Sequence, residues 1–376
     1  MRYSLGLATI AAALALFSGP LHAQDDNSIS PSTQTAPPIK GRVDRVKVHG
    51  VSLAGNLMGE TDSPEVSIYL PPSYAKNPKR HYPVIYFLHG YNGADTQYFR
   101  DPGPRYATTA VEEAFSSGAA QEMIIVIPNC MNGYGGCMYS NSPVTGNWED
   151  FIADDLVAYV DQHYRTLAKR ESRGIAGQSM GGYGTLRIAM KRPDVFSSMW
   201  AMAPCCLNQG YPASNPVGQQ TAIEAIKTMD DLRAHQAKVK ASGRSDHVVL
   251  VAFATAAAWS PNPDKPPFYF DLPVKDGAIV PEVAARYGAN SPLALVSQFA
   301  PNLMKYKALA LDVGRDDSLL PSIREFDARL NQLKIPHAFT VRDGDHGSHV
   351  VSQIGTKILP FFSRNLSFQA SGGAEK

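Results

Sequence analysis

The stretch that most constrains the fold is residues 174–184, Gly-Ile-Ala-Gly-Gln-Ser-Met-Gly-Gly-Tyr-Gly. It contains Gly-x-Ser-x-Gly with Ser179 at the centre, after a short apolar run and before a segment, 185–190, with helical character. A sharp strand-to-helix turn at such a motif holds the serine hydroxyl clear of the sheet. Gly177 and Gly181 suit this turn, because side chains there would collide where strand and helix pack. The motif also arises by chance in a chain with 30 glycines, so its meaning depends on its context.

Apolar runs that alternate with helical segments predict the sheet around this turn. Residues 82–88 and 123–128 are nearly continuous apolar runs, typical of central strands buried on both faces, and 108–115 predicts a helix between them. This alternation indicates an α/β domain with a mostly parallel sheet and helices on both faces. Residues 42–58 and 65–70 alternate β-branched and polar side chains, which predicts two antiparallel strands at the sheet edge.

The same alternation continues toward the C-terminus. Further strands are expected at 196–202, 307–313 and 337–341, and further helices at 147–164, at 319–333 and before Phe362. We expect Asn147 to cap the first of these helices, with Asp150 three residues later as in a capping box.

The alternation breaks in an insertion at about residues 205–304. Here 221–241 predicts an exposed helix, and 259–270 is rich in proline and aromatic residues. An insertion at the carboxyl end of such a sheet usually covers the site, so we expect a cap; the alternative is a surface loop whose aromatic side chains pack onto the core. Candidates for the substrate pocket are His89, Trp148, Trp259, Phe268 and Tyr269.

The N-terminus has the pattern of a secretory signal peptide at residues 1–23, with a positive start, an apolar core and a small-residue cleavage site near Ala23. The apolar run is shorter than the roughly 20 residues that a membrane span needs, so we expect no membrane anchor. Residues 24–41 predict a flexible linker, 42–366 the folded domain, and 367–376 a disordered tail. The mature chain is therefore expected to be secreted or periplasmic.

Composition and cysteine content indicate what kind of protein this is. With 44% hydrophobic and 18% charged residues the chain can bury a core, and its net charge of +1 gives no case for binding nucleic acid. Export makes disulfides stable, and a bond between the adjacent Cys205 and Cys206 would be strained. We expect a Cys130–Cys137 disulfide; the alternative is four buried free thiols.

A serine at this kind of turn needs a base beside it, because its hydroxyl is a poor nucleophile at neutral pH. The base is a histidine oriented by a carboxylate, and in folds with this turn the chain order is serine, acid, histidine. Asp316 and Asp317 follow one expected strand, and either could serve as the acid or cap the next helix. His346 follows the last expected strand and is preferred to His349, which falls in the final helix.

The negative oxygen of an acyl-transfer intermediate must meet two backbone N–H groups. Met180, directly after the serine, is expected to supply one, and Tyr91, in the loop after strand 82–88, the other. We expect His89 to brace this loop rather than to act as a second base or a metal ligand. No histidine and carboxylate cluster has metal-ligand spacing, so we expect no metal and no other cofactor.

These motifs together resemble those of the esterase D, feruloyl esterase and antigen 85 group of α/β-hydrolases. The segments are 88–90 (Leu-His-Gly), 177–183 (Gly-Gln-Ser-Met-Gly-Gly-Tyr), 314–317 (Gly-Arg-Asp-Asp) and 344–346 (Gly-Asp-His), with further similarity at 141–143, 147–150 and 259–263. The resemblance covers roughly residues 42–366. It implies the α/β-hydrolase fold, Ser179 as nucleophile, Asp317 as the acid and His346 as the base.

Members of that group act on different substrates: carboxylic esters, S-formylglutathione, feruloyl–sugar esters, or mycolyl chains that they transfer. We therefore expect an exported serine esterase that acts on a small-molecule or carbohydrate-linked ester. Export argues against S-formylglutathione, a cytosolic thioester. One alternative is an acyltransferase, in which a sugar hydroxyl replaces water. Another is a hydrolase-fold binding protein without activity; such proteins usually lose a triad residue, whereas each role here has a candidate.

Overall fold

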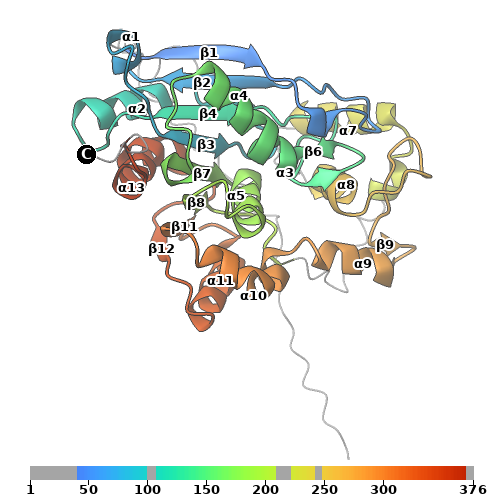
Figure 1. The fold of residues 1–376 in the computed structure, drawn as a ribbon. Coiled ribbons are helices and arrows are strands. Elements are labelled where there is room, and N and C mark those ends of the chain that lie inside the picture. Colours follow the sequence, from blue (N-terminus) through green and yellow to red (C-terminus); the bar gives the residue numbers. More distant parts are fainter. Residues whose placement is uncertain (1–39, 100–106, 209–221, 242–247, 370–376) are drawn as a thin grey trace, which may run out of the picture. The chain divides into compact units, whose positions relative to one another are not determined.

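The computed structural model describes residues 40–99, 107–208, 222–241 and 248–369 (Figure 1). The predicted signal peptide, nearly all of the linker and most of the predicted tail lie outside these residues. Within them, an eight-stranded sheet has the order β1-β2-β4-β3-β7-β8-β11-β12. Its strands are β1 Arg42–Lys47, β2 Glu65–Leu70, β3 Val84–Leu88, β4 Ile124–Pro128, β7 Arg173–Gln178, β8 Ser198–Met202, β11 Ala308–Gly314 and β12 Ala338–Arg342.

The sheet is parallel from β4 to β12, and β2 pairs with β4 in the antiparallel direction. The antiparallel pair at one edge is confirmed, although β1 ends at Lys47, short of the predicted stretch to residue 58. A short 3₁₀ turn, Val51–Leu53, follows instead. Successive residues of β3 enter opposite cores: Tyr86 and Leu88 one, Ile85 and Phe87 the other. This period of two places a buried layer on each face.

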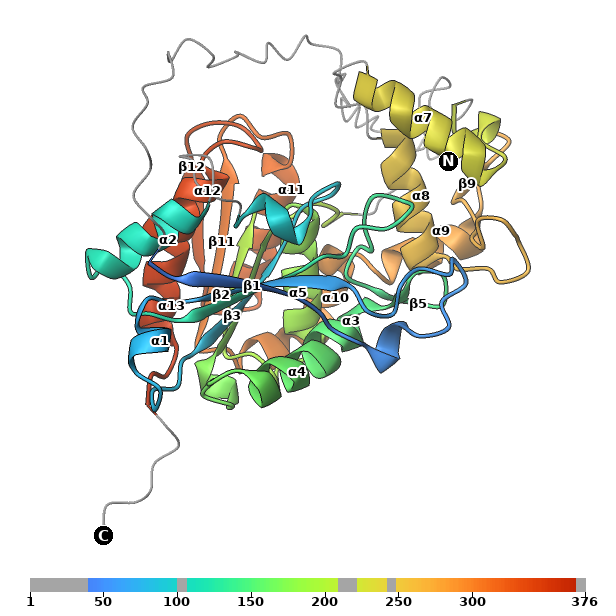
Figure 2. The same ribbon diagram turned by 90° about the horizontal axis from the view of Figure 1, so that it is seen from above.

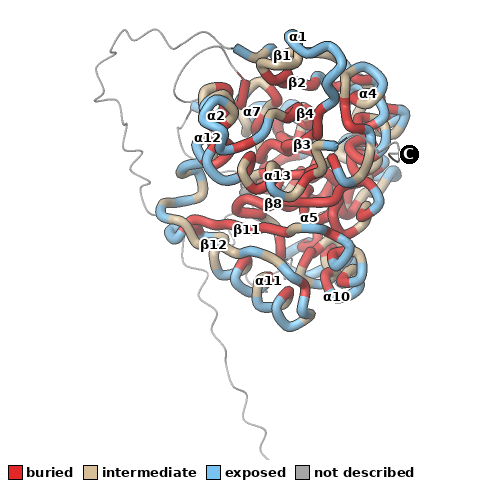
Figure 3. The backbone as a smooth tube through the Cα atoms, turned by 60° about the vertical axis from the view of Figure 1, so that its left-hand side comes forward, coloured by how far each residue is buried: buried red, intermediate tan, exposed pale blue. Residues whose placement is uncertain are grey.

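Helices cover both faces, as Figures 1 and 2 show. One face carries α2 Ala107–Ser116, α12 Val350–Gln353 and α13 Leu359–Asn365. The other carries α3 Trp148–Asp150, α4 Leu156–His163, α5 Met180–Lys191, α10 Pro292–Leu303 and α11 Leu320–Gln332. The strands run through the buried centre of the molecule (Figure 3). The predicted α/β-hydrolase fold is confirmed by this arrangement. None of the helices in the described ranges is long and apolar enough to cross a membrane.

The helix that begins at Trp148 is capped differently from the prediction. The Asn147 side chain makes no cap hydrogen bond. Instead the Asn141 Oδ1 accepts hydrogen bonds from the backbone N–H groups of Glu149 and Asp150, at 3.0 and 3.2 Å. Two short paired strands, β5 Asn141–Ser142 and β6 Gly146–Asn147, place Asn141 opposite Asn147 and hence beside the helix start. The capping oxygen therefore comes from across a turn.

The insertion consists mainly of helices, shown in yellow to orange in Figure 2. They are α7 Met229–Ala241, α8 Val248–Trp259 and α9 Pro281–Gly288, with a two-stranded hairpin of β9 Val274–Lys275 and β10 Ala278–Ile279. α7 is mostly exposed, as predicted, and covers the later part of the predicted helix. α8 was not predicted. It is apolar on nearly every side and its described side chains are mostly buried, so it lacks the periodicity that identifies a surface helix.

A buried ion pair joins α5, the helix that follows Ser179, to neighbouring elements. Arg187 Nε lies 2.7 Å from Glu149 Oε2, and both side chains are 7% exposed. Arg187 also donates to Asn290 Oδ1 at 2.6 Å, just beyond α9. Removing Arg187 would leave the buried Glu149 carboxylate with only Lys191 Nζ, 3.1 Å away, as a cationic partner.

We therefore expect Arg187→Met to lower the free energy of unfolding by about 3 kcal/mol. Urea denaturation followed by circular dichroism would measure the change. The matched control is Arg192→Met at the end of the same helix, where the pair with Asp154 is more exposed and its loss should cost less than about 1 kcal/mol. Equal effects of the two substitutions would contradict this account.

Candidate active site

Ser179 lies at the turn between β7 and α5, in a backbone conformation that is rare for a non-glycine residue. Its φ is 58° and its ψ is −114°. The turn is held by the Ser179 N–H, which donates to the Met202 carbonyl at 2.9 Å. It also depends on small residues: a Cβ on Gly181 would lie 1.9 Å from the Leu88 carbonyl oxygen, and one on Gly177 2.4 Å from the Gly181 oxygen. Only glycine allows these backbones to approach so closely.

Three side chains predicted from separate segments form one hydrogen-bonded chain. The Ser179 Oγ lies 2.8 Å from His346 Nε2, and His346 Nδ1 lies 2.8 Å from Asp317 Oδ2. Asp317 is buried, and its other carboxylate oxygen accepts the Leu319 N–H at 2.9 Å. Asp316 and His349, the alternatives, are both exposed and take no part in this chain. With the hydroxyl donating to Nε2 and Nδ1–H donating to the carboxylate, the geometry suits proton removal from the serine.

A second network, not predicted from the sequence, fixes the loop that carries His346. Asp312 is buried in β11 and accepts hydrogen bonds from Trp200 Nε1 at 2.5 Å and Arg342 Nε at 3.1 Å. Burial raises the pKa of the Asp312 carboxyl, and these two hydrogen bonds act in the opposite direction. Arg342 also donates to the carbonyl oxygen of Asp345 at 3.0 Å, one residue before His346. A carboxylate in the otherwise apolar run Ala-Leu-Ala-Leu-Asp-Val-Gly was the available sequence signal.

The turn after β3 passes directly beside the nucleophile. A Cβ on Gly90 would lie 3.6 Å from the Ser179 Cβ. The next residue, Tyr91, donates its hydroxyl to the Tyr134 carbonyl at 2.6 Å, and burial raises the pKa of that phenol, which favours the protonated donor. Met180 begins α5 beside this turn. These positions place the backbone of Tyr91 and Met180 near Ser179; their role in holding an oxyanion stays a prediction.

His89 braces this turn and is not part of a pocket. It is fully buried; its Nδ1 donates to the Gly90 carbonyl at 2.8 Å, and its Nε2 accepts the Cys130 N–H at 2.9 Å. Both ring nitrogens are therefore occupied by backbone groups, which fixes a neutral tautomer. The structural role expected for His89 agrees with these contacts, whereas its place among the pocket candidates is wrong.

Cys130 and Cys137 are free thiols in the structure, as are Cys205 and Cys206, so the predicted disulfide is not formed there. Both Cys130 and Cys137 are fully buried, and burial raises the pKa of the Cys137 thiol, which keeps it protonated. The loop between them is closed instead by Asn132, whose Oδ1 accepts the N–H groups of Tyr134 and Gly136 at 2.9 and 3.0 Å.

The predicted aromatic pocket residues separate into core and cavity positions. Trp259 is buried between Tyr183 and Tyr287. Trp148 donates to the Thr145 carbonyl and lines a cavity of about 260 Å³ whose lining includes none of Ser179, Asp317 and His346. The prediction for Trp259 is therefore wrong, because its ring fills the core, whereas a substrate-binding role for Trp148 stays a prediction.

Phe268 lines a cavity within the insertion, and the half-buried Tyr269 does not line it. Part of the aromatic segment thus packs into the core, as the alternative expectation had it, and part faces this cavity; a cap over the site stays a prediction. Across the described ranges, no group of three histidine, cysteine or acidic side chains could hold a metal ion.

Comparisons of the sequence with known proteins find esterases. The family model "Putative esterase" matches residues 60–363. An esterase of Mycobacterium tuberculosis, Rv1288, is 36% identical over 143 residues, which cover 36% of this chain and 28% of that protein. The chain thus spans under a third of this relative's length. A xylanase/feruloyl esterase of Xylanibacter ruminicola is 27% identical over 133 residues, 35% of this chain and 18% of that protein.

Solved structures show the same fold. A ferulic acid esterase superposes with a TM-score of 0.59 at 22% identity, over 88% of this chain and all of the other. An S-formylglutathione hydrolase of Staphylococcus aureus gives a TM-score of 0.54 at 15% identity, over 86% of this chain and 99% of the other.

The contacts of Asp316 and Asp317 differ, so the same substitution should have a large effect on kcat at one residue and a small effect at the other. Asp317→Asn should lower kcat by about 10³–10⁴-fold, because an amide no longer selects the Nδ1–H tautomer of His346. Asp316→Asn, the matched control on the exposed neighbour, should stay within about threefold of the parent. Steady-state hydrolysis of p-nitrophenyl acetate would measure both. A large loss of kcat in Asp316→Asn but not in Asp317→Asn would show that Asp316, and not Asp317, is the acid.

The Asp312–Arg342 network predicts a positioning effect. Arg342→Lys keeps the charge but cannot reach both Asp312 and the Asp345 carbonyl, so kcat should fall about tenfold with KM nearly unchanged. Arg315→Lys, whose pair with Asp343 is exposed, is the control and should leave both constants as they are. A rise in KM at unchanged kcat would show that Arg342 serves substrate binding instead.

Proposed function

Because the chain belongs to the "Putative esterase" family, we propose that it hydrolyses carboxylic esters through an acyl-enzyme formed on Ser179. The observation that carries the proposal is the continuous hydrogen-bonded chain Ser179–His346–Asp317 at a strained strand-to-helix turn. A buried carboxylate, a histidine and a serine in this order are the groups that acyl transfer requires.

In the first step, Ser179 Oγ attacks the ester carbonyl carbon as His346 Nε2 removes its proton. The carbonyl oxygen becomes negative and is held by the backbone N–H groups of Met180 and Tyr91. The tetrahedral intermediate then collapses: the bond to the alcohol oxygen breaks, and His346 returns the proton to that oxygen. Asp317 keeps the imidazole oriented and stabilises its positive charge throughout.

In the second step, water takes the place of the alcohol. His346 accepts a proton from the water, whose oxygen attacks the acyl carbon, and the second tetrahedral intermediate releases the acid and regenerates Ser179. The strained backbone conformation of Ser179 supports these two steps. Such strain persists only where the surrounding structure imposes it, and the close packing at Gly177 and Gly181 does so here.

We further propose a feruloyl or acetyl ester of a sugar as the substrate class. Two features support it. The N-terminal pattern predicts export, and a relative that is 27% identical over its matched region is described as a xylanase/feruloyl esterase. An exported enzyme meets plant-polymer esters rather than cytosolic thioesters.

The test compares the purified mature chain with Ser179→Ala on p-nitrophenyl acetate and butyrate. The parent should turn over, and the variant should lose activity by about 10⁴-fold or more while retaining its circular dichroism spectrum. A fluorophosphonate probe should label the parent at Ser179 and leave the variant unlabelled. Equal activity of the two proteins would refute Ser179 as nucleophile. Methyl ferulate and acetylated xylose would then be compared as substrates.

A further inference from the structure

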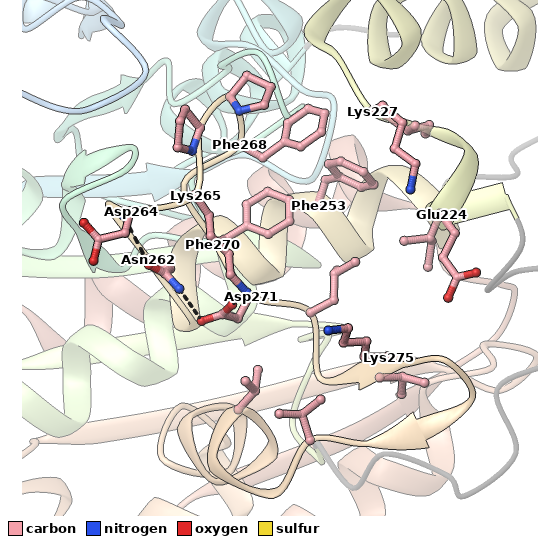
Figure 4. Close-up of a pocket in the computed structure, with 18 of the residues that line it drawn as sticks. Glu224, Lys227, Phe253, Asn262, Asp264, Lys265, Phe268, Phe270, Asp271 and Lys275 are labelled. Carbon is pink, nitrogen blue, oxygen red and sulfur yellow. Dashed lines mark hydrogen bonds and ion pairs between the residues drawn. The ribbon is translucent and has the colours of Figure 1, made fainter.

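The insertion contains a cavity of about 830 Å³ whose lining includes neither Ser179, Asp317 nor His346. Figure 4 shows it between α8, the segment from Asn262 to Lys275, and the segment that carries Glu224 and Lys227. This volume is in the range of sites that bind small organic molecules. The cavity is thus a second place where the molecule can receive a ligand.

One wall of the cavity is aromatic. The rings of Phe253, Phe268 and Phe270 pack against one another, with centroids 5.0 Å apart for Phe253–Phe268, 5.3 Å for Phe253–Phe270 and 5.8 Å for Phe268–Phe270. Phe253 and Phe270 are buried, whereas Phe268 is half-buried and keeps part of its ring open. The first two rings therefore hold the third in a fixed orientation. The face of an aromatic ring carries partial negative charge and attracts polarised C–H groups.

The charges around the cavity balance. Its lining contains four acidic side chains, Glu224, Asp264, Asp271 and Glu282, and four basic ones, Lys227, Lys265, Lys275 and Arg286. A site for an anion or a cation would show an excess of the opposite charge, and a site for an acyl chain would show an apolar rim. The other lining residues are Asn262 and eleven apolar ones, so the lining suits a neutral ligand that has both hydrogen-bonding groups and apolar faces.

Some polar side chains of the cavity bond to one another, and others have no partner in the part of the chain that the structure describes and are available to a ligand. Asp271 accepts from Asn262 Nδ2 at 2.9 Å (Figure 4). It also pairs with Lys265 and Arg286, which fixes that side of the rim. By contrast, within the described residues, the side chains of Asp264, Lys227 and Lys275 have no hydrogen-bond or ion-pair partner. Carboxylates accept and ammonium groups donate, so these groups match hydroxyls, which do both.

We propose that this cavity binds a neutral oligosaccharide, with a sugar ring stacked on Phe268 and its hydroxyls bonded to the available polar side chains. The choice of a sugar rests on the proposed function, because a carbohydrate-linked ester would bring such a chain to the enzyme. The binding itself requires no turnover.

Two hydrogen bonds connect this cavity to the turn beside Ser179. The Phe268 carbonyl accepts the Tyr134 hydroxyl at 3.1 Å, and the Tyr134 carbonyl accepts the Tyr91 hydroxyl at 2.6 Å. The residue that would contact the sugar is therefore linked through one tyrosine to the predicted oxyanion turn.

The experiment uses the Ser179→Ala chain, which binds without turnover, and isothermal titration calorimetry with xylotetraose and cellotetraose as probes. At least one probe should bind saturably at one site. In the same background, Phe268→Leu, which keeps an apolar side chain but removes the ring, should weaken that binding about tenfold. Tyr269→Ala removes the neighbouring aromatic ring that does not line the cavity, and it should leave the affinity unchanged. Thermal unfolding would verify that all the variants are folded.

Absence of saturable binding by both probes would overturn the proposal, as would equal weakening by Phe268→Leu and Tyr269→Ala. Ferulate binding that depends on Phe268 while neither sugar binds would assign the cavity to a phenolic ligand and would also overturn it. Hydrolysis of p-nitrophenyl acetate by the parent chain is measured separately. If that hydrolysis occurs and sugar binding does not, the cavity proposal fails and the proposed function stands. If sugar binds and the parent chain does not hydrolyse p-nitrophenyl acetate, the cavity proposal stands and the proposed function fails.

Discussion

The close contact between the end of β3 and the start of α5 is the constraint on which the rest of the site depends. Gly181 lies against the Leu88 carbonyl so closely that a methyl group would have no room. This contact turns the chain sharply at Ser179 and brings the Tyr91 turn beside it. A side chain at Gly181 would push strand and helix apart and move the nucleophile away from the turn that faces it.

Much of this could be predicted from the sequence, because the relevant signals are local. The apolar runs gave the central strands, and the residues that follow strand ends, Asp317 and His346, lie where parallel strands bring their carboxyl ends together. Other features depend on contacts between distant segments. The helix at Trp148 is capped by Asn141 because a small hairpin places it there, and no spacing rule shows that. α8 went unpredicted because a helix that is apolar all round has no periodicity.

The aromatic residues show a further limit of sequence reasoning. Trp148, Trp259 and Phe268 look alike as candidates for a pocket, yet Trp259 fills the core, whereas Trp148 and Phe268 line two different cavities. Composition identifies large side chains with a stacking surface, but only the tertiary structure decides which ring face stays open. The same holds for Asp312, whose role as an anchor for Arg342 becomes visible only when β11 and β12 are paired.

The strand order has a consequence for how the protein loses activity when it begins to unfold. His346 follows β12, which is the last strand of the sheet and has a neighbour on one side only. Edge strands with partly exposed residues open locally at lower free energy than strands in the centre, and every residue of β12 is at least partly exposed. Ser179 lies at the end of a central strand. Fraying of one edge would therefore separate the base from a nucleophile whose surroundings are still intact, so the protein can become inactive while most of its sheet remains folded.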